Sequence, residues 1–457
     1  MQISKNILKN DRKEIFGWLM YDWANSAFYT TVIGVLLGPY LTALAQADVG
    51  ERGVALSLGP IGDLTAEALV PAALGISVAA QVILLPVLGS IADYTHLKKP
   101  MMAFFCYLGV TASSLLFFVS KGHDYLWGCF LMIIANMSFA AANVFYNAFL
   151  VDITTEENRD KISSYGFAYG YVSGILMLIV NLATIQYSDQ LGISKSFAVR
   201  LSMLLASLWW GVFALVTFAL LKPRKSPLEK PKDRPLLIIG FTELWKTCKE
   251  LKNLKQTTLF LMAYLFYNDG IQTVILNSSV FLSQELFDEE GRKSNQPFLL
   301  AIFFVAQVAA LIGSLFFERV SRVLGTKRTI LACLTIWCAV VIYAYAFLTS
   351  TYQAWIMSSF IGLVLGSTQA LSRSLYSQMI PIGRESSFFG LYEISEKGTS
   401  WLGQLIFAAV VNTTGSYRQA ILALIVFFFV GGTILLFTDV EKGVEEAERA
   451  EAILEQA

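Results

Sequence analysis

The feature that most constrains this chain is a series of apolar runs, each long enough to cross a membrane as a helix. Crossing about 30 Å of hydrocarbon at 1.5 Å per residue takes roughly 20 helical residues. Such runs recur along the whole 457-residue chain, of which only 15% is charged, against about 25% in soluble domains. We therefore expect an all-α membrane protein and disfavour a soluble enzyme. Twelve transmembrane helices are predicted, near residues 16–45, 68–92, 101–120, 125–150, 162–187, 198–221, 257–282, 297–319, 329–348, 353–378, 387–411 and 418–438.

The distribution of positive charge predicts the orientation of these helices. If the amino terminus is cytoplasmic, the inside segments hold 25 of the 34 Lys and Arg residues and the outside loops hold 6. This asymmetry satisfies the positive-inside rule, so both termini are expected in the cytoplasm. The start of the chain lacks a short apolar core followed by a small-residue cleavage site, so we expect no signal peptide.

The longest hydrophilic interruption, residues 222–235, follows the sixth predicted span and divides the chain into two halves. We expect six-helix bundles at 1–221 and 257–438, a cytoplasmic linker at 222–256 and an acidic cytoplasmic tail at 439–457. The linker contains an amphipathic pattern that indicates a helix. That helix would lie either against the inner leaflet or against other cytoplasmic loops.

The two halves carry weak internal similarity. The first span contains LMYDWANSAF and the seventh contains LFYNDGIQTV, so both place an aspartate close to a tyrosine and to amides. The connection before the fifth span contains SSYG, and the connection before the eleventh contains SSFFG. Together these matches predict two pseudosymmetric bundles.

The loop GSIADYTHLKKPMM is the most specific short motif. Gly89, Asp93, Lys98 and Lys99 follow the G-x-x-x-D-x-x-x-x-[KR]-[KR] pattern of the major facilitator superfamily. Gly89 would allow two helices to approach closely, and Asp93 would pair with basic groups or a helix amino terminus. Ordinary cytoplasmic anchoring would explain the lysines but not Gly89 and Asp93. We add Asp152, at the end of the fourth span, to this predicted gating set.

The second-half loop RVSRVLGTKRT keeps the glycine and the basic pair but has Arg322 where the aspartate would be. The stronger gate is therefore expected in the first half.

Longer motifs point to a family. They are YDWANSAFYT, YNAFLVDIT, SSYGFAYGY, YNDGIQTV and TQALSRSLYSQMIPIGRESSFFGLYEISEKGTSWLG. The chain resembles the autophagy-related vacuolar amino-acid effluxer family, a branch of the major facilitator superfamily, over nearly its whole length. The resemblance implies two pseudosymmetric six-helix bundles, alternating access and amino-acid export. The compact loops look more like a bacterial inner-membrane member.

Polar residues at membrane depth usually face a cavity or a partner, because burying them in lipid costs several kcal/mol. Asp22, Asn25 and Tyr29 fall on one helical face and are predicted to line a central cavity. Alternatively, Asp22, about one turn from the cytoplasmic end, snorkels or caps a neighbouring helix. In the seventh span, Asn268, Asp269 and Gln272 form either the pseudosymmetric counterpart or a polar seam between helices.

The fourth span carries a stripe of three amides, of which the last two are predicted substrate ligands: Asn136, Asn143 and Asn147. The fifth span carries a stripe of three glycines that we assign to close helix packing: Gly166, Gly170 and Gly174.

The tenth span carries Gln369 and Arg373, four residues apart. Arg373 is the best candidate for a substrate anchor, because its guanidinium stays charged and matches a carboxylate bidentately. The structural alternative is a salt bridge to Glu393 or Asp269.

In the eleventh span, Tyr392 and Trp401 would line the pocket, whereas Glu393 and Lys397 stand in the favourable order for a local ion pair. Four carboxylates are candidates to carry a coupled proton: Asp22, Asp269, Glu393 and Glu396.

These patterns predict a secondary active transporter that moves a small organic solute, foremost an amino acid, by alternating access, with possible proton coupling. Other cargoes (a lysolipid, sugar or peptide) and a non-transporting sensor or scaffold stay open. We expect no enzyme activity, cofactor, metal or nucleic acid. The bilayer and a small-molecule substrate are the expected partners, and the chain is expected to function as a monomer.

Overall fold

The structure, a computed structural model, is built almost entirely of helices. It describes residues 9–50, 53–57, 63–224, 236–287, 296–397 and 400–456. The long helices are α1 (Arg12–Phe28) continued by a π-helical segment η1 (Tyr29–Leu36) and α2 (Leu37–Val49), α3 (Ala66–Asp93), α4 (Lys98–Leu115) with η3 (Leu116–Phe118), α5 (Asp124–Ile153), α6 (Glu156–Gln186), α7 (Lys195–Leu220), α9 (Lys255–Phe287), α10 (Gln296–Leu324), α11 (Thr326–Ala346) and α12 (Thr351–Gln378). The shorter helices are α8 (Leu236–Glu250), α13 (Glu385–Lys397), α14 (Ser400–Thr414), α15 (Tyr417–Ala423), α16 (Ile425–Phe437) and α17 (Val440–Gln456). A small antiparallel hairpin, β1 (Val54–Ser57) with β2 (Asp63–Thr65), connects α2 to α3.

Eleven helical segments among the described residues are long and apolar enough to cross a membrane. They correspond to eleven of the twelve predicted spans, and the all-α membrane fold is confirmed. The remaining prediction, 387–411, coincides with two shorter helices, α13 and α14. The exact count of twelve therefore stays a prediction.

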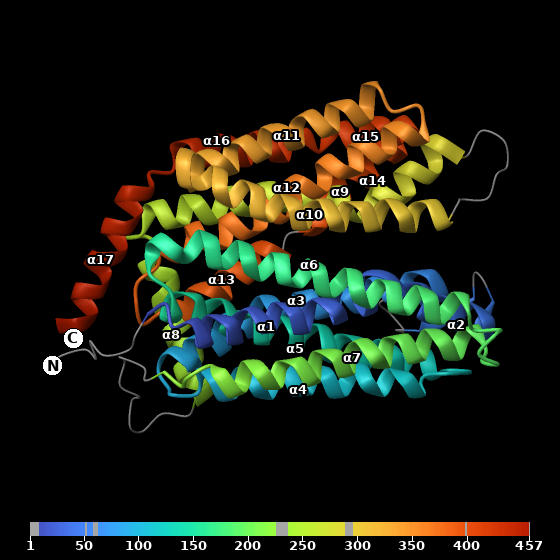
Figure 1. The fold of residues 1–457 in the computed structure, drawn as a ribbon, viewed down its shortest axis with the longest axis horizontal. Coiled ribbons are helices and arrows are strands. Elements are labelled where there is room, and N and C mark those ends of the chain that lie inside the picture. Colours follow the sequence, from blue (N-terminus) through green and yellow to red (C-terminus); the bar gives the residue numbers. More distant parts are fainter. Residues whose placement is uncertain are drawn as a thin grey trace.

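The helices form two bundles that lie side by side (Figure 1). Helices α1 to α7 make one bundle, and α9 to α16 make the other. The bundles meet mainly where α3 and α5 contact α13 and where α6 contacts α10 and α12. Helix α5 is the most deeply buried of the long helices, since most of its side chains face other helices.

Matching polar anchors support a common plan for the bundles. Lys99 donates to the carbonyl of Leu221, just after α7, at 2.7 Å. Lys327 likewise donates to the carbonyls of Leu436 and Thr438, at the end of α16, at 2.8 and 2.7 Å. In each bundle a lysine that begins one helix thus satisfies carbonyls left open at the end of another.

The opposite end of each bundle has a second matching anchor. Arg200 donates to the carbonyl of Phe117 at 2.9 Å, and Arg418 donates to the carbonyl of Tyr345 at 3.0 Å. Arg200 stands early in α7 and Arg418 early in α15, at the start of the last span of each bundle. Each arginine holds the end of the third span of its bundle, at η3 and α11. The pseudosymmetry is therefore visible in individual contacts, although the sequence similarity between the halves is weak.

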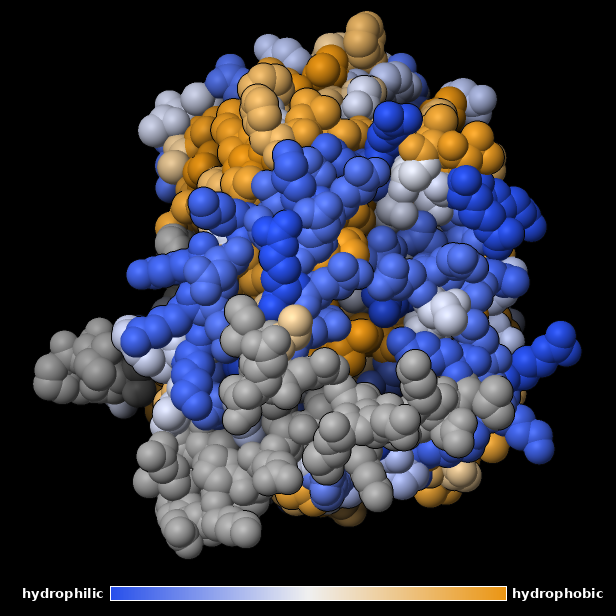
Figure 2. Space-filling model, turned by 90° about the vertical axis from the view of Figure 1, so that its left-hand side faces the viewer, coloured by the Kyte–Doolittle hydropathy of each residue, from blue (hydrophilic) through white to orange (hydrophobic). Residues whose placement is uncertain are grey.

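Helices α8 and α17 lie at the end of the molecule that carries both termini (Figure 1). This end is hydrophilic and has an apolar rim (Figure 2). Helix α8 packs on α3 through Gly240, where an added Cβ would lie 2.7 Å from Val87. Its other side leaves Phe241 54% and Trp245 66% exposed. Helix α8 thus packs on the bundle and also presents an apolar side outward.

The tail does more than extend into solvent. Glu446 of α17 accepts a hydrogen bond from the backbone N–H of Gln256, and Glu451 accepts one from that of Ile382, at 3.0 and 2.7 Å. The acidic tail therefore binds open N–H groups beneath the second bundle.

Candidate functional site

The centre of the interface between the bundles is occupied by Arg373 of α12. Its side chain is buried, and its three hydrogen-bonding nitrogens all reach into the first bundle. Nε donates to Ser163 Oγ and Nη2 to the Ser163 carbonyl, both at 2.9 Å, while Nη1 donates to Asn147 Oδ1 at 3.2 Å. The cation of one bundle is thus held by the other.

Asp22 of α1 supplies the opposite charge. Its Oδ2 lies 3.6 Å from Arg373 Nη2 and accepts a 2.7 Å hydrogen bond from the Tyr146 hydroxyl. The guanidinium also faces the rings of Trp18 and Phe167, at 4.9 and 4.5 Å. Aromatic faces attract a cation, so both ring contacts and the carboxylate stabilise the buried charge. We name Arg373, Asp22, Tyr146, Ser163 and Asn147 the Arg373 cluster.

The carboxylate of Asp22 is directed into the interface between the bundles. Helix α1 begins at Arg12, which puts Asp22 nearly three turns, or about 15 Å, along the helix from that end. The contacts of Asp22 with Tyr146 and Arg373 favour the cavity-facing prediction over snorkelling. Arg373 thus pairs with Asp22. The alternative partners that we considered for this arginine were Glu393 and Asp269.

A glycine makes room for the ion pair. A Cβ added to Gly166 of α6 would lie 2.4 Å from Asp22 Oδ2 and 3.0 Å from Arg373 Nη2. Farther along α6, Gly170 and Gly174 face Ser26 and Thr30 of the same bundle. The glycine stripe packs α6 against α1 as expected, and at its first position it also opens space for charges.

Asn147 connects the Arg373 cluster to α13. Its Nδ2 donates to Glu393 Oε1 at 2.9 Å while its Oδ1 accepts from Arg373. One turn away, Asn25 Nδ2 donates to Asn143 Oδ1 at 3.0 Å, linking α1 to α5. Asn136, in contrast, donates to Ser77 inside the first bundle and takes no part in this network.

The seventh-span pair has a different position. Asn268 of α9 donates to the carbonyl of Glu396 at 2.7 Å, and Asp269 accepts from the N–H of Gly403 at 3.1 Å. Glu396 stands near the end of α13, and Gly403 stands in the first turn of α14. The pair therefore caps the facing ends of two helices, where open carbonyls and N–H groups occur.

The other predicted ligands divide into three situations. Tyr392 stacks on Tyr264 inside the second bundle, with ring centroids 4.5 Å apart. Gln272 and Gln369 are partly exposed and make no hydrogen bond within the described part of the chain. Tyr29 is 42% exposed and stacks on Phe139. The side chains of Trp401 and Lys397 lie outside the described residues.

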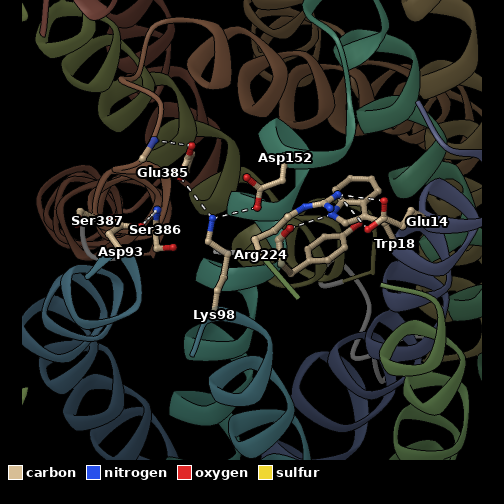
Figure 3. A network of polar contacts seen from close by, with 11 residues as sticks. Glu14, Trp18, Asp93, Lys98, Asp152, Arg224, Glu385, Ser386 and Ser387 are labelled. Carbon is tan, nitrogen blue, oxygen red and sulfur yellow. Dashed lines mark hydrogen bonds and ion pairs between the residues drawn. The ribbon is translucent and has the colours of Figure 1, made fainter. Parts of the chain in front are cut away.

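The gating motif joins α3 to the start of α13 (Figure 3). Asp93 accepts from the N–H groups of Ser386 and Ser387, at 2.9 and 2.7 Å, and from the Ser387 hydroxyl at 2.6 Å. A carboxylate here satisfies open donors and complements the helix dipole. A Cβ on Gly89 would lie 2.1 Å from the carbonyl of Ser386, so only glycine permits this approach.

Lys98 completes this gate. Its Nζ lies 3.1 Å from Asp152 in its own bundle and 3.4 Å from Glu385 at the start of α13 (Figure 3). The lysine thus holds one carboxylate from each side of the interface. Lys99 does not cross it, because its contact is the anchor to α7 described above.

A residue of the first bundle that the sequence analysis missed contacts the second-half loop RVSRVLGTKRT. Arg322 pairs with Glu318 of its own helix. The acidic partner across the interface is Asp160 of α6, whose Oδ2 accepts from Ser321 and Thr326 at 3.0 and 2.6 Å. The motif would place an aspartate in the second bundle, at the position of Arg322. The structure instead has the carboxylate in the first bundle, at Asp160.

Further interface contacts were also missed. Arg159 donates to the carbonyl of Ser377 at the end of α12, at 2.8 Å. Arg384, which precedes α13, donates to Glu250 of α8 at 3.0 Å and to Thr247. The RD pair and the GRE triplet within the charged loops were the available signal. Ser163 and Tyr146 appeared only within the longer motifs SSYG and YNAFLVDIT, and Trp18 had no signal beyond its polarity.

All these interbundle contacts lie between the middle of the molecule and the end that carries the termini. The structure is therefore closed at that end. Among the described residues, no group of three His, Cys, Asp or Glu side chains could hold a metal ion.

Solved structures with the same architecture are transporters. The chain matches a human organic anion transporter, MFSD10, with a TM-score of 0.66 at 12% identity, covering 94% of this chain and 100% of that one. It matches a bacterial homologue of the iron transporter ferroportin in an outward-facing state with a TM-score of 0.64 at 12% identity, covering 94% and 99%. At such identities the likeness shows the fold alone.

Proteins found by sequence comparison are more similar to this chain than these solved structures are. An uncharacterized MFS-type transporter of Bacillus subtilis, YxiO, is 32% identical over 97% of this chain and 99% of its own length. Autophagy-related protein 22-1 of Penicillium rubens is 24% identical over 95% of this chain and 91% of its own. The family described as "Vacuole effluxer Atg22 like" matches residues 10–448. This multi-pass membrane protein is therefore an MFS-type transporter and belongs to the Atg22-like vacuole effluxer family.

Proposed function

We propose that this protein exports a small amino acid by alternating access of its two bundles. The observation that carries the proposal is the Arg373–Asp22 pair, in which each bundle contributes one largely buried charge to the interface. An amino acid carries a carboxylate and an ammonium group within one small molecule. Its two charges would match Arg373 and Asp22 once movement of the bundles separates them. The family description as an effluxer supports the direction of transport.

The geometry suggests which contact yields to the substrate. Arg373 Nη2 is 3.6 Å from Asp22, longer than its 2.9 Å hydrogen bonds to Ser163. A substrate carboxylate would displace Asp22 from the guanidinium more readily than it would displace Ser163. The aromatic faces of Trp18 and Phe167 would keep the guanidinium oriented.

Proton coupling is proposed to run through Asp22. A proton on this carboxylate would remove its charge and release Arg373 for the substrate. Glu393 is the second candidate, because Asn147 connects it to the same arginine. Asp269 is occupied with the N–H of Gly403, and no hydrogen bond among the described residues joins the Glu396 carboxylate to the Arg373 cluster. Both are therefore ranked below Asp22.

The proposal also includes orientation and assembly. Both termini would be cytoplasmic, in a bacterial plasma membrane, because the end that carries them is hydrophilic and most Lys and Arg residues belong to its loops. The bundles at 1–221 and 257–438 would rock about the Arg373 cluster. The linker 222–256 and the tail 439–457 would lie on the cytoplasmic face. One chain, acting as a monomer, would provide the whole transport unit.

The first experiment is counterflow of a labelled amino-acid mixture into liposomes that contain the purified protein. Counterflow needs no ion gradient, so it tests the cargo before the coupling. We expect uptake by the parent, loss of uptake in Arg373→Lys, and unchanged uptake in Arg322→Lys. Arg322 is a matched control, because its pair with Glu318 lies within one helix.

Absence of uptake by the parent protein with every amino acid would contradict the proposal that the cargo is an amino acid. Activity with a lysolipid, sugar or peptide would then identify the alternative, and silence with all of them would favour a sensor or scaffold. Coupling is tested separately with Asp22→Asn. This variant is expected to lose uptake driven by a pH gradient while it keeps some counterflow, and retention of both activities would exclude Asp22 as the proton carrier.

A further inference from the structure

A pocket of about 360 Å³ lies between α1 and α6 near the end that carries the termini. Every residue that lines it belongs to the first bundle, so it is separate from the interface where the Arg373 cluster lies. Two cations, Arg12 and Lys161, stand at its edge, and its walls include Ile15, Phe16 and Leu19. The pocket therefore combines positive charge with an apolar surface.

Neither cation has a carboxylate partner among the described residues. Arg12 and Lys161 form no ion pair with any described residue, whereas neighbouring charges such as Arg224 and Glu14 are paired. Lys161 instead lies over the ring of Tyr165, with Nζ 5.7 Å from its centroid. A cation held on an aromatic face keeps donors available for a further anion.

The pocket lies at the start of a membrane-spanning segment. Arg12 is the first residue of Arg12–Val49, a segment long and apolar enough to cross a membrane. A charged residue at the end of such a segment is expected at the level of the lipid headgroups. Lys161 lies one to two turns deeper on its own helix and reaches the same level by snorkelling. Phe16, which is 44% exposed, would face the acyl chains.

We propose that this pocket binds one anionic phospholipid of the cytoplasmic leaflet. The phosphate would accept charge-assisted hydrogen bonds from Arg12 and Lys161. One acyl chain would run along Ile15, Phe16 and Leu19. The charge complementarity selects an anionic lipid over a zwitterionic one, because two cations without carboxylate partners favour a net negative headgroup. The bound lipid would tie α1 to α6, the two helices that carry Asp22 and Gly166.

The test is native mass spectrometry of the detergent-purified full chain, titrated with phosphatidylglycerol or phosphatidylcholine that carries identical acyl chains. The parent is expected to bind one phosphatidylglycerol more tightly than phosphatidylcholine. Each cation near a membrane surface contributes about fivefold in affinity. The double variant Arg12→Gln with Lys161→Gln should therefore lose roughly 25-fold in affinity for phosphatidylglycerol.

The matched control removes two exposed cations on the same side of the molecule that do not line the pocket, as Lys13→Gln with Lys252→Gln. It should bind phosphatidylglycerol within about twofold of the parent. Equal losses in both double variants, or equal affinity of the parent for both lipids, would overturn the proposal. Inorganic phosphate or glycerol phosphate at millimolar concentration should not displace the lipid. Displacement by either would assign the pocket to a soluble anion and would also overturn it.

Discussion

Asp22 of α1 and Asp269 of α9 occupy corresponding spans of the two bundles, yet their surroundings differ. Asp22 faces Arg373 across the interface, so its partner belongs to the other bundle. Asp269 accepts from Gly403 of its own bundle, so its partner moves with it. The comparison teaches that two related motifs can separate into an element that joins the two bundles and an element that holds a helix break.

The largest effect is expected from breaking the interbundle pair. Arg373→Gln leaves the Asp22 carboxylate buried without its cation, which costs about 3–5 kcal/mol. The pair exists only when the bundles are in this arrangement. Its loss therefore destabilises the conformation that is closed at the end carrying the termini. Counterflow should drop at least a hundredfold. Spin labels at the exposed positions Leu97 of the first bundle and Val323 of the second should show the two bundles moving apart at this end. An unchanged distance distribution would contradict the role of the pair in closing it.

The second prediction compares the two aspartates directly. Asp269→Ala removes the acceptor at the start of α14 and should lower unfolding stability by about 1–2 kcal/mol. Transport per folded molecule should stay within about threefold of the parent, because no charge at the interface changes. Asp22→Ala should show the reverse pattern, with transport lost and melting temperature less affected. Thermal unfolding and counterflow on the same preparations measure both, and parallel losses in the two variants would remove the distinction.

A smaller effect is expected from the glycines that line α1. Gly166→Ala places a Cβ 2.4 Å from Asp22 Oδ2, whereas Gly174→Ala places one 3.1 Å from Thr30 Oγ1. The first variant should reduce transport about tenfold, since even small displacements of positioned groups are costly. The second should stay near the parent value. Equal activity of the two variants would show that Gly166 serves packing alone.

The smallest effect concerns the two loops that close the terminal end. Asp93→Asn weakens three hydrogen bonds at the start of α13, and Asp160→Asn weakens two to the α10–α11 loop. Each charged hydrogen bond contributes about 1.5–3 kcal/mol, and the asparagine retains part of it. The fraction of molecules open at the terminal end should rise more in Asp93→Asn. A larger rise in Asp160→Asn would place the stronger gate in the second half.

The membrane fold and some of the polar residues at the interface could be predicted from the sequence. Long apolar runs have few alternatives to membrane-spanning helices, because every backbone group must be satisfied within the lipid. The motif around Asp93 indicated one contact between the bundles, since its glycine and carboxylate have specific roles at a helix crossing. Arg373 was conspicuous for the same physical reason, because a charge at membrane depth requires a partner.

What the sequence did not determine is which partner each polar group has. Asp22 and Asp269 have similar neighbours along the chain, but only the packing of the bundles places one at the interface and the other at a helix break. Asp160 supplied a carboxylate that the second-half loop lacks, from a position 161 residues before Ser321 in the sequence. Periodicity specifies the face of a helix, whereas the partner depends on which helix packs against that face. That choice was decided by the tertiary structure.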